Sequence, residues 1–379
     1  MNKLIYLDSN SLGNVHEGYN SSSLLMFSYL YDKVEYRSCK SSKESVFAII
    51  GDVPSNIHYK PIKVVKMDTR IKSFCHHIFR AFTNIKYVVK AKDSVLLINA
   101  NNLWELPIIN FLLKIIKRKV IVVCHGELEF LVSGNSINKI SRRVLSWMKN
   151  PKTKISKGLY FSVLGTSILK NVEKELPLHV ASHFISFNLT FISSKFEKET
   201  SHNNKIKIGV IGTAHANKGL REILLFGEKL KQFQNYEFYT LGRVLCSPNV
   251  LRENGVRYIV GADKEFVSRD SLASYIKEMD IIVFLHSMES YKFTASSSLM
   301  DAIDFEKPIL SLHNDYFDYI HEKVNYGELF SDINEIIMYL QNTDCINMMI
   351  DYKKNKEILS PYYERIEFCD SLKRIGFLS

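Results

Sequence analysis

The sequence has little that would form a covalent or metal framework. Its six cysteines are scattered singly along 379 residues and never form a C-x-x-C pair. Isolated thiols in a chain of this length are usually reduced core or surface residues, which argues against a disulfide scaffold and a zinc site. The patterns G-x-G-x-x-G and G-x-x-x-x-G-K-[ST] are also absent. The sequence therefore supports neither a nicotinamide-binding Rossmann site nor a P-loop.

Long apolar segments are missing as well. The longest, LPIINFLLKII from Leu106, is interrupted by Lys114 and is far shorter than the roughly 20 residues of a membrane-spanning helix. The first residues, MNKLIYLDSNS, lead from one lysine into a strand-like segment without the pattern of a signal peptide. We therefore expect a cytoplasmic protein that is either free or attached peripherally to the inner face of the cell membrane.

Acidic residues are scarce in the first half only. Residues 1–190 contain 27 Lys and Arg against 13 Asp and Glu, whereas residues 191–379 contain the remaining 23 against 27. The cations are mixed with large apolar side chains at 70–92, 109–120 and 140–157. Such segments are typical either of solvated helix faces or of helices lying on an anionic bilayer. A nucleic-acid partner is not expected, because no recognition motif accompanies the charge.

Short β-rich runs alternate with amphipathic stretches in both halves of the chain. The first half has strand-like runs at 3–9, 94–100, 119–125 and 159–165 and an expected helix at 104–117. After a polar stretch at 193–205, further strands are expected at 206–212, 236–242, 256–261, 281–286 and 308–312. Expected helices in this half are 218–232, 269–280 and one from about Ser296, and 362–377 could form a last helix.

This rhythm predicts the α/β fold class, with two doubly wound Rossmann-like domains facing a central cleft. The expected first domain is 1–190, followed by a linker at 191–205. The expected second domain is 206–355, and 356–379 is expected to be a helix that packs back toward the first domain.

Two segments of the second half carry groups suited to an anion. Gly212 ends the first strand there, and Lys218 and Gly219 open the following helix, at the sheet edge where phosphates bind helix amino termini. The segment SSSLMDAIDFEKPIL begins a helix with Ser296, Ser297 and Ser298 and has Asp301 one turn later. The serines can cap backbone amides or leave them for a diphosphate. The aspartate can serve the helix dipole or accept hydrogen bonds from ribose hydroxyls.

Four segments of the second half, in this order, resemble those of GT-B glycosyltransferases, most closely the retaining family 4 type (glycosyl transferases group 1). They are IGVIGTAHANKGLREIL, YTLG, VRYIVGADKEFVSRDSLASYIKEMDIIVFLH and SSSLMDAIDFEKPIL, which span most of 206–312. In that family the lysine before glycine binds the donor diphosphate, the helix start holds the phosphates, and an acidic residue before the Lys-Pro pair contacts the ribose. The resemblance assigns these roles to Lys218, Ser296–Ser298 and Asp301.

The sequence departs from this family at three positions. Asp301 replaces the usual glutamate at the ribose position, and Phe293 stands where a partner glutamate normally faces the donor sugar. Thr213 follows Gly212 where an arginine is common. Glu289 and Tyr291, in the loop before the helix, are the alternatives for sugar recognition.

The first half resembles the family more loosely. The segment KVIVVCHGELEFL is similar to the family's strand that ends in a histidine facing the donor sugar, which points to His125, with Glu127 and Glu129 beside it. The loop at 8–22 has the place of the family's acceptor loop, and Gly13, His16 and Gly18 are its candidate lining residues. Ordinary turn chemistry explains these glycines equally well.

The resemblance implies a retaining glycosyltransferase of the hexosyltransferase type, with acceptor binding in the first domain and donor binding in the second. The expected co-substrate is a UDP- or GDP-linked sugar, and no cofactor or metal is expected, in line with the absence of an Asp-x-Asp triplet. The expected acceptor is a glycan or a lipid-linked acceptor in bacterial surface polysaccharide synthesis. The alternatives are a sugar-nucleotide epimerase or hydrolase of the same fold and a catalytically inactive scaffold.

Overall fold

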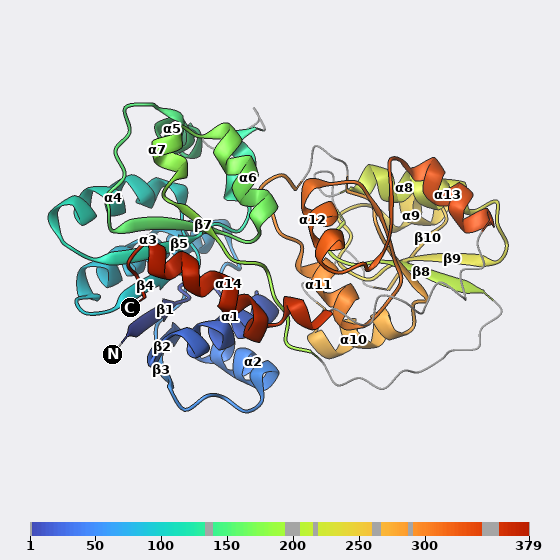
Figure 1. The fold of residues 1–379 in the computed structure, drawn as a ribbon. Helices are drawn as coiled ribbons and strands as arrows, with labels where there is room; N and C mark the ends of the chain where they lie inside the picture. The colour runs from blue at the N-terminus through green and yellow to red at the C-terminus, as the bar shows by residue number, and fades with distance from the viewer. Residues whose placement is uncertain are drawn as a thin grey trace. The chain divides into compact units, whose positions relative to one another are not determined.

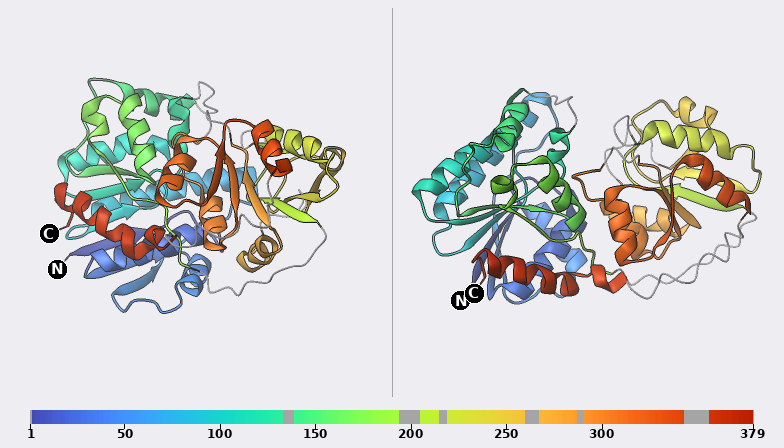
Figure 2. Two further views of the ribbon diagram at one scale, coloured as in Figure 1. Left: turned by 45° about the vertical axis from the view of Figure 1, so that its right-hand side comes forward. Right: turned by 45° about the horizontal axis from the view of Figure 1, so that its top comes forward.

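The chain divides into two compact units, each built on its own parallel β-sheet (Figures 1 and 2). The first unit comprises Met1–Ile192, Phe293–Ala295 and Leu359–Ser379, and the second comprises Ser193–Lys292 and Ser296–Ile358. The structure is a computed structural model that describes residues 2–132, 139–193, 205–214, 219–259, 267–286, 291–342 and 356–378. Most of the expected linker at 191–205 therefore lies outside the described residues.

The first sheet has seven strands in the order β3-β2-β1-β4-β5-β6-β7, all parallel. The strand order reverses between β1 and β4, because the chain builds one side of the sheet with β2 and β3 and then returns to the other side. Ligands of open α/β sheets bind at such a switch point, beyond the carboxyl ends of the strands. The strands are β1 (Lys3–Leu7), β2 (Lys33–Ser38), β3 (Ile57–Pro61), β4 (Val95–Ile98), β5 (Lys119–Val123), β6 (Leu159–Val163) and β7 (Phe184–Ser186).

The helices of the first unit include one from the end of the chain, α14, which packs against α1 (Figure 1). The ring of Phe368 in α14 meets that of Phe27 in α1 edge to face, with centroids 5.8 Å apart. The Glu364 carboxylate of α14 accepts hydrogen bonds from the backbone and the side-chain amide of Asn188 at 2.7 and 2.6 Å. The helices are α1 (Glu17–Leu30), α2 (Lys40–Ile50), α3 (Arg70–Lys90), α4 (Leu106–Ile115), α5 (Lys139–Lys149), α6 (Thr166–Glu175), α7 (Leu178–Ala181) and α14 (Pro361–Arg374).

The second sheet has six parallel strands in the order β10-β9-β8-β11-β12-β13, with its switch point between β8 and β11. Its core includes Phe226 of α8 against Phe238 of β9, with ring centroids 4.9 Å apart. The strands are β8 (Ile206–Val210), β9 (Tyr236–Thr240), β10 (Val256–Tyr258), β11 (Ile281–Phe284), β12 (Ile309–Leu312) and β13 (Gly327–Phe330). The helices are α8 (Leu220–Leu230), α9 (Pro248–Glu253), α10 (Arg269–Lys277), α11 (Ser297–Asp304), α12 (Asp315–Lys323) and α13 (Ile333–Asn342).

The expected strands and the α/β fold class are confirmed: the nine predicted strand runs are β1, β4, β5, β6, β8, β9, β10, β11 and β12. The four strands that the sequence did not predict are β2, β3, β7 and β13, and three of these lie at sheet edges. Edge strands are short and partly solvated, so β3 and β13 carry charged or exposed residues in place of an apolar run.

No helix in the described ranges is long and apolar enough to cross a membrane. The five cysteines within those ranges are all free thiols, namely Cys39, Cys75, Cys124, Cys246 and Cys369.

Candidate functional site

Polar side chains meet at the carboxyl edge of the first sheet. Asp8 follows β1 and Asn99 follows β4, and Asn20 of α1 joins them across the switch point. The Asn20 amide donates to Asp8 Oδ2 at 2.9 Å, and the Asn99 amide donates to Asn20 Oδ1 at 2.6 Å. All three residues are buried, and burial raises the pKa of Asp8. This polar cluster fixes the loops on which the expected acceptor residues lie.

His125 lies at the same edge, after β5. Its Nε2 lies 2.7 Å from the Asn99 backbone oxygen, to which it donates a hydrogen bond. The Tyr19 ring meets the imidazole edge to face at a centroid distance of 4.7 Å, and the His16 ring lies 5.5 Å away. The structure therefore brings together His125 and His16, which the sequence assigned to catalysis and to acceptor binding.

The two loop glycines have different surroundings. Gly13 has a positive φ of 58° and its N–H donates to Ser41 Oγ at 3.1 Å. Gly18 is in the first turn of α1, directly after His16 and Glu17. His16 itself has a φ of 57°, which is uncommon for a residue with a side chain. The loop thus turns sharply twice before α1 begins, and its contact with an acceptor stays a prediction.

Glu127 organises the turn that follows His125. Its Oε2 accepts hydrogen bonds from the N–H groups of His125 and Gly126 at 2.9 and 3.0 Å, and its Oε1 accepts one from the Asn101 amide at 2.7 Å. These contacts orient the His125 backbone relative to the end of β4. A catalytic role for Glu127 stays a prediction.

Glu129 contacts the segment that contains one of the departures from the family pattern. Its Oε1 accepts hydrogen bonds from the Phe293 N–H at 2.7 Å and from Thr294 Oγ1 at 2.9 Å. The Phe293 side chain is buried. A Cβ at Gly126 would lie 2.9 Å from Thr294 Oγ1, so a larger residue there would require the Thr294 side chain to move. Phe293 therefore has a packing role, and Glu129 fixes its backbone.

The loop after β8 lies at the switch point of the second sheet. Gly212 has a φ of 110°, and a Cβ there would lie 3.1 Å from Ser298 Oγ of α11. Gly219, with a φ of 70°, precedes α8, and its Cβ would lie 3.3 Å from the Leu285 carbonyl oxygen beyond β11. The two glycines thus allow this loop to approach both the end of β11 and the amino terminus of α11. Thr213 lies between them and is half-buried.

The three serines at the start of α11 differ in function. Ser296 is buried and is the N-cap, and its Oγ accepts a hydrogen bond from the Leu299 N–H at 3.2 Å. Ser297 is exposed and Ser298 is half-buried. The capping interpretation therefore holds for Ser296. Ser298 faces the Gly212 turn, where an anion would meet the helix amino terminus.

Asp301 forms an ion pair with Arg269 of α10, with Arg269 Nη1 at 2.5 Å from Asp301 Oδ1. Burial raises the pKa of Asp301, and the Arg269 charge opposes this increase. One carboxylate oxygen is thus held by an arginine that the sequence did not single out. Ribose binding by Asp301 stays a prediction.

Arg243 is a residue that sequence reasoning missed. It follows β9, and its carbonyl oxygen accepts a hydrogen bond from the Ala214 N–H at 2.9 Å. Within the described residues its buried Nε has no hydrogen-bond partner. A Cβ at the preceding Gly242 would overlap the Gly212 carbonyl oxygen at 2.2 Å, so the two turns are in contact. The YTLG segment, which resembles the family, ends directly before Arg243. Its position is the sequence signal that could have identified this arginine as a candidate site residue.

Two of the expected donor residues, Lys218 and Glu289, lie outside the described residues. Tyr291 is described: it has a φ of 60° and its ring stacks on that of His286 at a centroid distance of 4.4 Å. His286 follows β11, so the Tyr291 ring lies near the switch point of the second sheet. Tyr291 is thus positioned near the donor groups, and its contact with a sugar stays a prediction.

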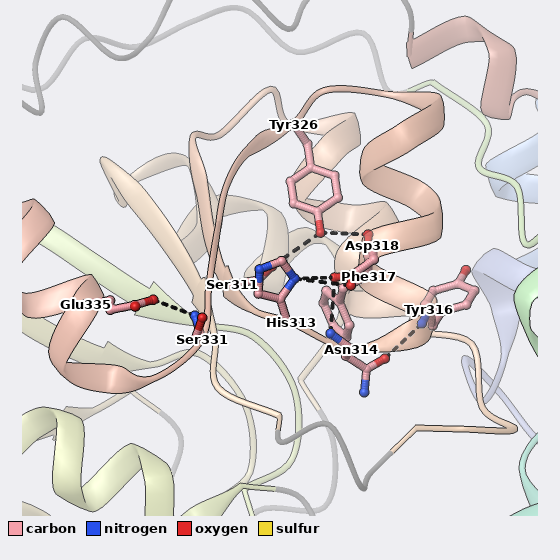
Figure 3. Close-up of polar contacts among 9 residues, drawn as sticks. All are labelled: Ser311, His313, Asn314, Tyr316, Phe317, Asp318, Tyr326, Ser331 and Glu335. Atoms are coloured by element: carbon pink, nitrogen blue, oxygen red, sulfur yellow. Dashed lines mark hydrogen bonds and ion pairs between the residues drawn. The ribbon is translucent and has the colours of Figure 1, made fainter.

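Polar groups after β12 and β13 make hydrogen bonds with α12 and α13 (Figure 3). Asn314 Oδ1 accepts from the Tyr316 N–H at 3.0 Å at the start of α12, and Asp318 Oδ2 lies 3.1 Å from His313 Nδ1. Glu335 accepts from the Ser331 N–H at 2.7 Å. These contacts are local to their helices, which makes the β8/β11 switch point the better site for a ligand. Among the described residues no group of three or more His, Cys, Asp and Glu could hold a metal ion.

No protein-family model matches the sequence, and no curated protein matches it. Solved structures do match. HepE of Anabaena, determined with UDP, is 12% identical with a TM-score of 0.62, over 99% of this chain and 100% of that one. The lipopolysaccharide outer core galactosyltransferase WaaB is 12% identical with a TM-score of 0.58, over 98% and 99% of the two chains. Sucrose-phosphate synthase of Thermosynechococcus elongatus is 12% identical with a TM-score of 0.61, over 99% of each chain. The chain therefore has the two-sheet α/β architecture of the GT-B fold.

Proposed function

We propose that the protein is a glycosyltransferase that moves a sugar from a nucleotide-diphosphate donor to a glycan or lipid-linked acceptor. The observation that carries this proposal is the convergence of Gly212, Gly219 and the amino terminus of α11 at the β8/β11 switch point. Close backbone approach and a helix amino terminus are features that bind a diphosphate. HepE, which shares the fold, was determined with UDP and with UDP-glucose, and this supports the donor class.

In the proposed reaction, the bond between the anomeric carbon and the diphosphate oxygen breaks, and the acceptor hydroxyl oxygen bonds to that carbon. The proton of the acceptor hydroxyl passes to the leaving diphosphate oxygen. The leaving diphosphate gains negative charge, which the α11 amides, Lys218 and Arg243 would stabilise without a metal ion. His125 and Glu127 are the proposed catalytic residues on the first unit, where Glu127 orients the His125 backbone. Retention of configuration, the family 4 assignment and a hexosyl donor are parts of the same proposal.

We place this activity in bacterial surface polysaccharide synthesis, in the cytoplasm or at the inner face of the cell membrane. The basic first half of the chain supports the membrane alternative. An epimerase or hydrolase of the same fold would release free nucleotide without an acceptor, and an inactive scaffold would transfer nothing.

A panel of UDP- and GDP-sugars tests the proposal. We expect at least one of them to raise the melting temperature of the protein, and the free nucleotide to compete with it. The stabilising sugar is then incubated with the protein, with and without an extract of bacterial glycans and lipid-linked saccharides, and nucleotide release is measured. Acceptor-dependent release supports a transferase. Equal release without acceptor favours the hydrolase, and binding without release favours the scaffold.

A further inference from the structure

The buried face of helix α3 contains several polar residues, whereas several of its large apolar side chains are exposed to solvent. Three of its five buried residues are polar, namely His76, Arg80 and Asn84, and the other two are Ala81 and Val88. Its exposed residues include Ile71, Phe74 and Phe82, whose side chains are 77%, 65% and 66% exposed. A helix on the surface of a soluble protein normally has the opposite arrangement.

The polar contacts of the inner face fix this orientation. Arg80 Nη2 donates to Asn102 Oδ1 and Nη1 donates to Asn10 Oδ1. One helical turn later, the Asn84 amide donates to Glu105 Oε1 at 2.9 Å. Rotating α3 to bury its phenylalanines would break these contacts and leave buried polar groups without hydrogen-bond partners, which is unfavourable. The apolar side chains therefore stay outside unless another molecule covers them.

The neighbouring helix α4 extends the apolar surface. It packs beside α3, and Ile108, Phe111 and Ile115 are 41%, 62% and 68% exposed. Their spacing of three and four residues places them on one side of the helix. A contiguous exposed apolar surface on a soluble protein usually marks a binding surface. We define the α3–α4 face by its most exposed residues, Ile71, Phe74, Phe82, Phe111 and Ile115.

The charges around this face have one sign. Residues 60–92 contain nine Lys and Arg and one acidic residue, Asp68, which pairs with Lys72 at 2.7 Å. Residues 106–119 contain four Lys and Arg and no acidic residue. On α3, Lys86 and Lys90 are exposed. Apolar groups bordered by an excess of cations complement an anionic lipid surface, whereas a second copy of this face would bring like charges together.

We propose that the α3–α4 face docks on an anionic lipid bilayer. The phenylalanines and isoleucines enter the boundary between head groups and acyl chains, and the lysines contact the anionic head groups. This deepens the proposed function, since it names the membrane as the partner of the first unit. It rests on the exposed side chains and the charges of α3, α4 and the residues beside them, so vesicle binding is measurable without any nucleotide sugar.

Sedimentation of the full-length protein with liposomes tests the proposal. We expect binding to vesicles of phosphatidylcholine with about one quarter phosphatidylglycerol, weaker binding to pure phosphatidylcholine, and a decrease when salt rises above about 0.1 M, where screening acts within about 10 Å. The variant Ile71→Ser/Phe74→Ser/Phe82→Ser should bind anionic vesicles at least about tenfold more weakly than the wild type. It loses the apolar side chains that would be buried in the bilayer, and losing even part of that buried area is enough for a tenfold change in affinity. Lys86→Glu/Lys90→Glu should lower binding to anionic vesicles only.

The matched control replaces exposed apolar residues elsewhere. Leu178→Ser/Met338→Ser/Ile366→Ser changes side chains that are 83%, 52% and 54% exposed and should bind vesicles as the wild type does. Equal loss in both triple variants, or no vesicle binding at low salt, would overturn the proposal. A dimer in sedimentation velocity that the α3 triple variant dissociates would also overturn it in favour of a second copy. Nucleotide-sugar binding is measured on the same proteins. A protein that binds the sugar nucleotide but not the vesicles contradicts only the membrane proposal and leaves the transferase proposal standing.

Discussion

At the scale of single residues, Asp301 is both an ion-pair partner and the expected ribose ligand. Asp301→Asn should lower donor affinity and reduce discrimination against a 2′-deoxyribose donor, because the amide is a weaker acceptor for ribose hydroxyls. Calorimetric titration with ribo- and deoxyribonucleotide sugars measures both effects. Arg269→Gln is the control, since it removes the ion pair and keeps the carboxylate. If both variants lose affinity equally for the two donors, Asp301 has a structural role only.

Lys218 and Arg243 are expected to bind the donor diphosphate. Lys218→Ala and Arg243→Ala should each weaken nucleotide-sugar binding by about 1.5–3 kcal/mol, the range for charge-assisted hydrogen bonds. Arg252→Ala is a matched control, because Arg252 is an exposed arginine of the same unit that lies over the Tyr258 ring. Calorimetric titration of the three variants with the nucleotide sugar measures these affinities. Unchanged affinity in Lys218→Ala would remove the lysine from the site.

Glu105 should make the stability of the protein depend on pH. Burial raises its pKa from the usual 4.5 to about 7, against hydrogen bonds from Asn84 and Asn102 and the charge of Arg80. The folded state thus holds this proton more tightly than the unfolded state. Its contribution to stability is present below pH 4.5 and is lost as pH rises to about 7, by up to about 3 kcal/mol.

Glu105→Gln isolates this effect, because a glutamine oxygen can still accept hydrogen bonds from Asn84 and from the Asn102 N–H. Urea unfolding at about pH 4.5, 6 and 8 should show a smaller fall in the free energy of unfolding for the variant than for the wild type. Parallel curves would mean that Glu105 titrates normally.

At the scale of elements, the serines at the start of α11 have different expected roles: Ser296 caps the helix and Ser298 binds the ligand. Ser296→Ala removes the N-cap hydrogen bond to Leu299 and should lower the free energy of unfolding by about 1 kcal/mol. Ser298→Ala should leave stability nearly unchanged and lower donor affinity, since Ser298 faces the Gly212 turn. Urea unfolding and calorimetry on the two variants measure the difference. A large stability loss in Ser298→Ala would contradict the division of roles.

The elements also show what the sequence could predict. Buried parallel strands such as β4 and β5 are continuous apolar runs, so their positions follow from the pattern. The edge strand β3 includes His58, Lys60 and Pro61 and lacks such a run. Helix α3 has clear amphipathic periodicity, but the pattern alone does not say which face is inside. That choice depends on long-range partners of Arg80, such as Asn10 and Asn102.

The same limit applies to the candidate site. The positions of Gly212, Ser298 and Asp301 follow from local motifs at strand ends and a helix start. Arg243 and Arg269 come from other βα connections, and only the folded sheet brings them to these groups. The contact of His16 with His125 is also long-range, because the loop after β1 and the end of β5 are far apart in sequence.

At the scale of the whole molecule, the two halves of the chain differ in charge, and the chain returns to the first unit at its end. The first half has an excess of cations and the second a small excess of acidic residues. The last helix, α14, belongs to the first unit although it follows the second unit in sequence. This division fits a first unit that meets a membrane and an acceptor and a second unit that binds the donor.

The most direct test of the central claim is a crystal structure of the protein with bound UDP or the stabilising UDP- or GDP-sugar. We expect the diphosphate at the β8/β11 switch point, with phosphate oxygens about 3 Å from backbone N–H groups at the start of α11 and beside Gly212 and Gly219. We also expect the ribose hydroxyls to contact Asp301. A nucleotide bound elsewhere on the chain, or no nucleotide at saturating concentration, would contradict the assignment of this site.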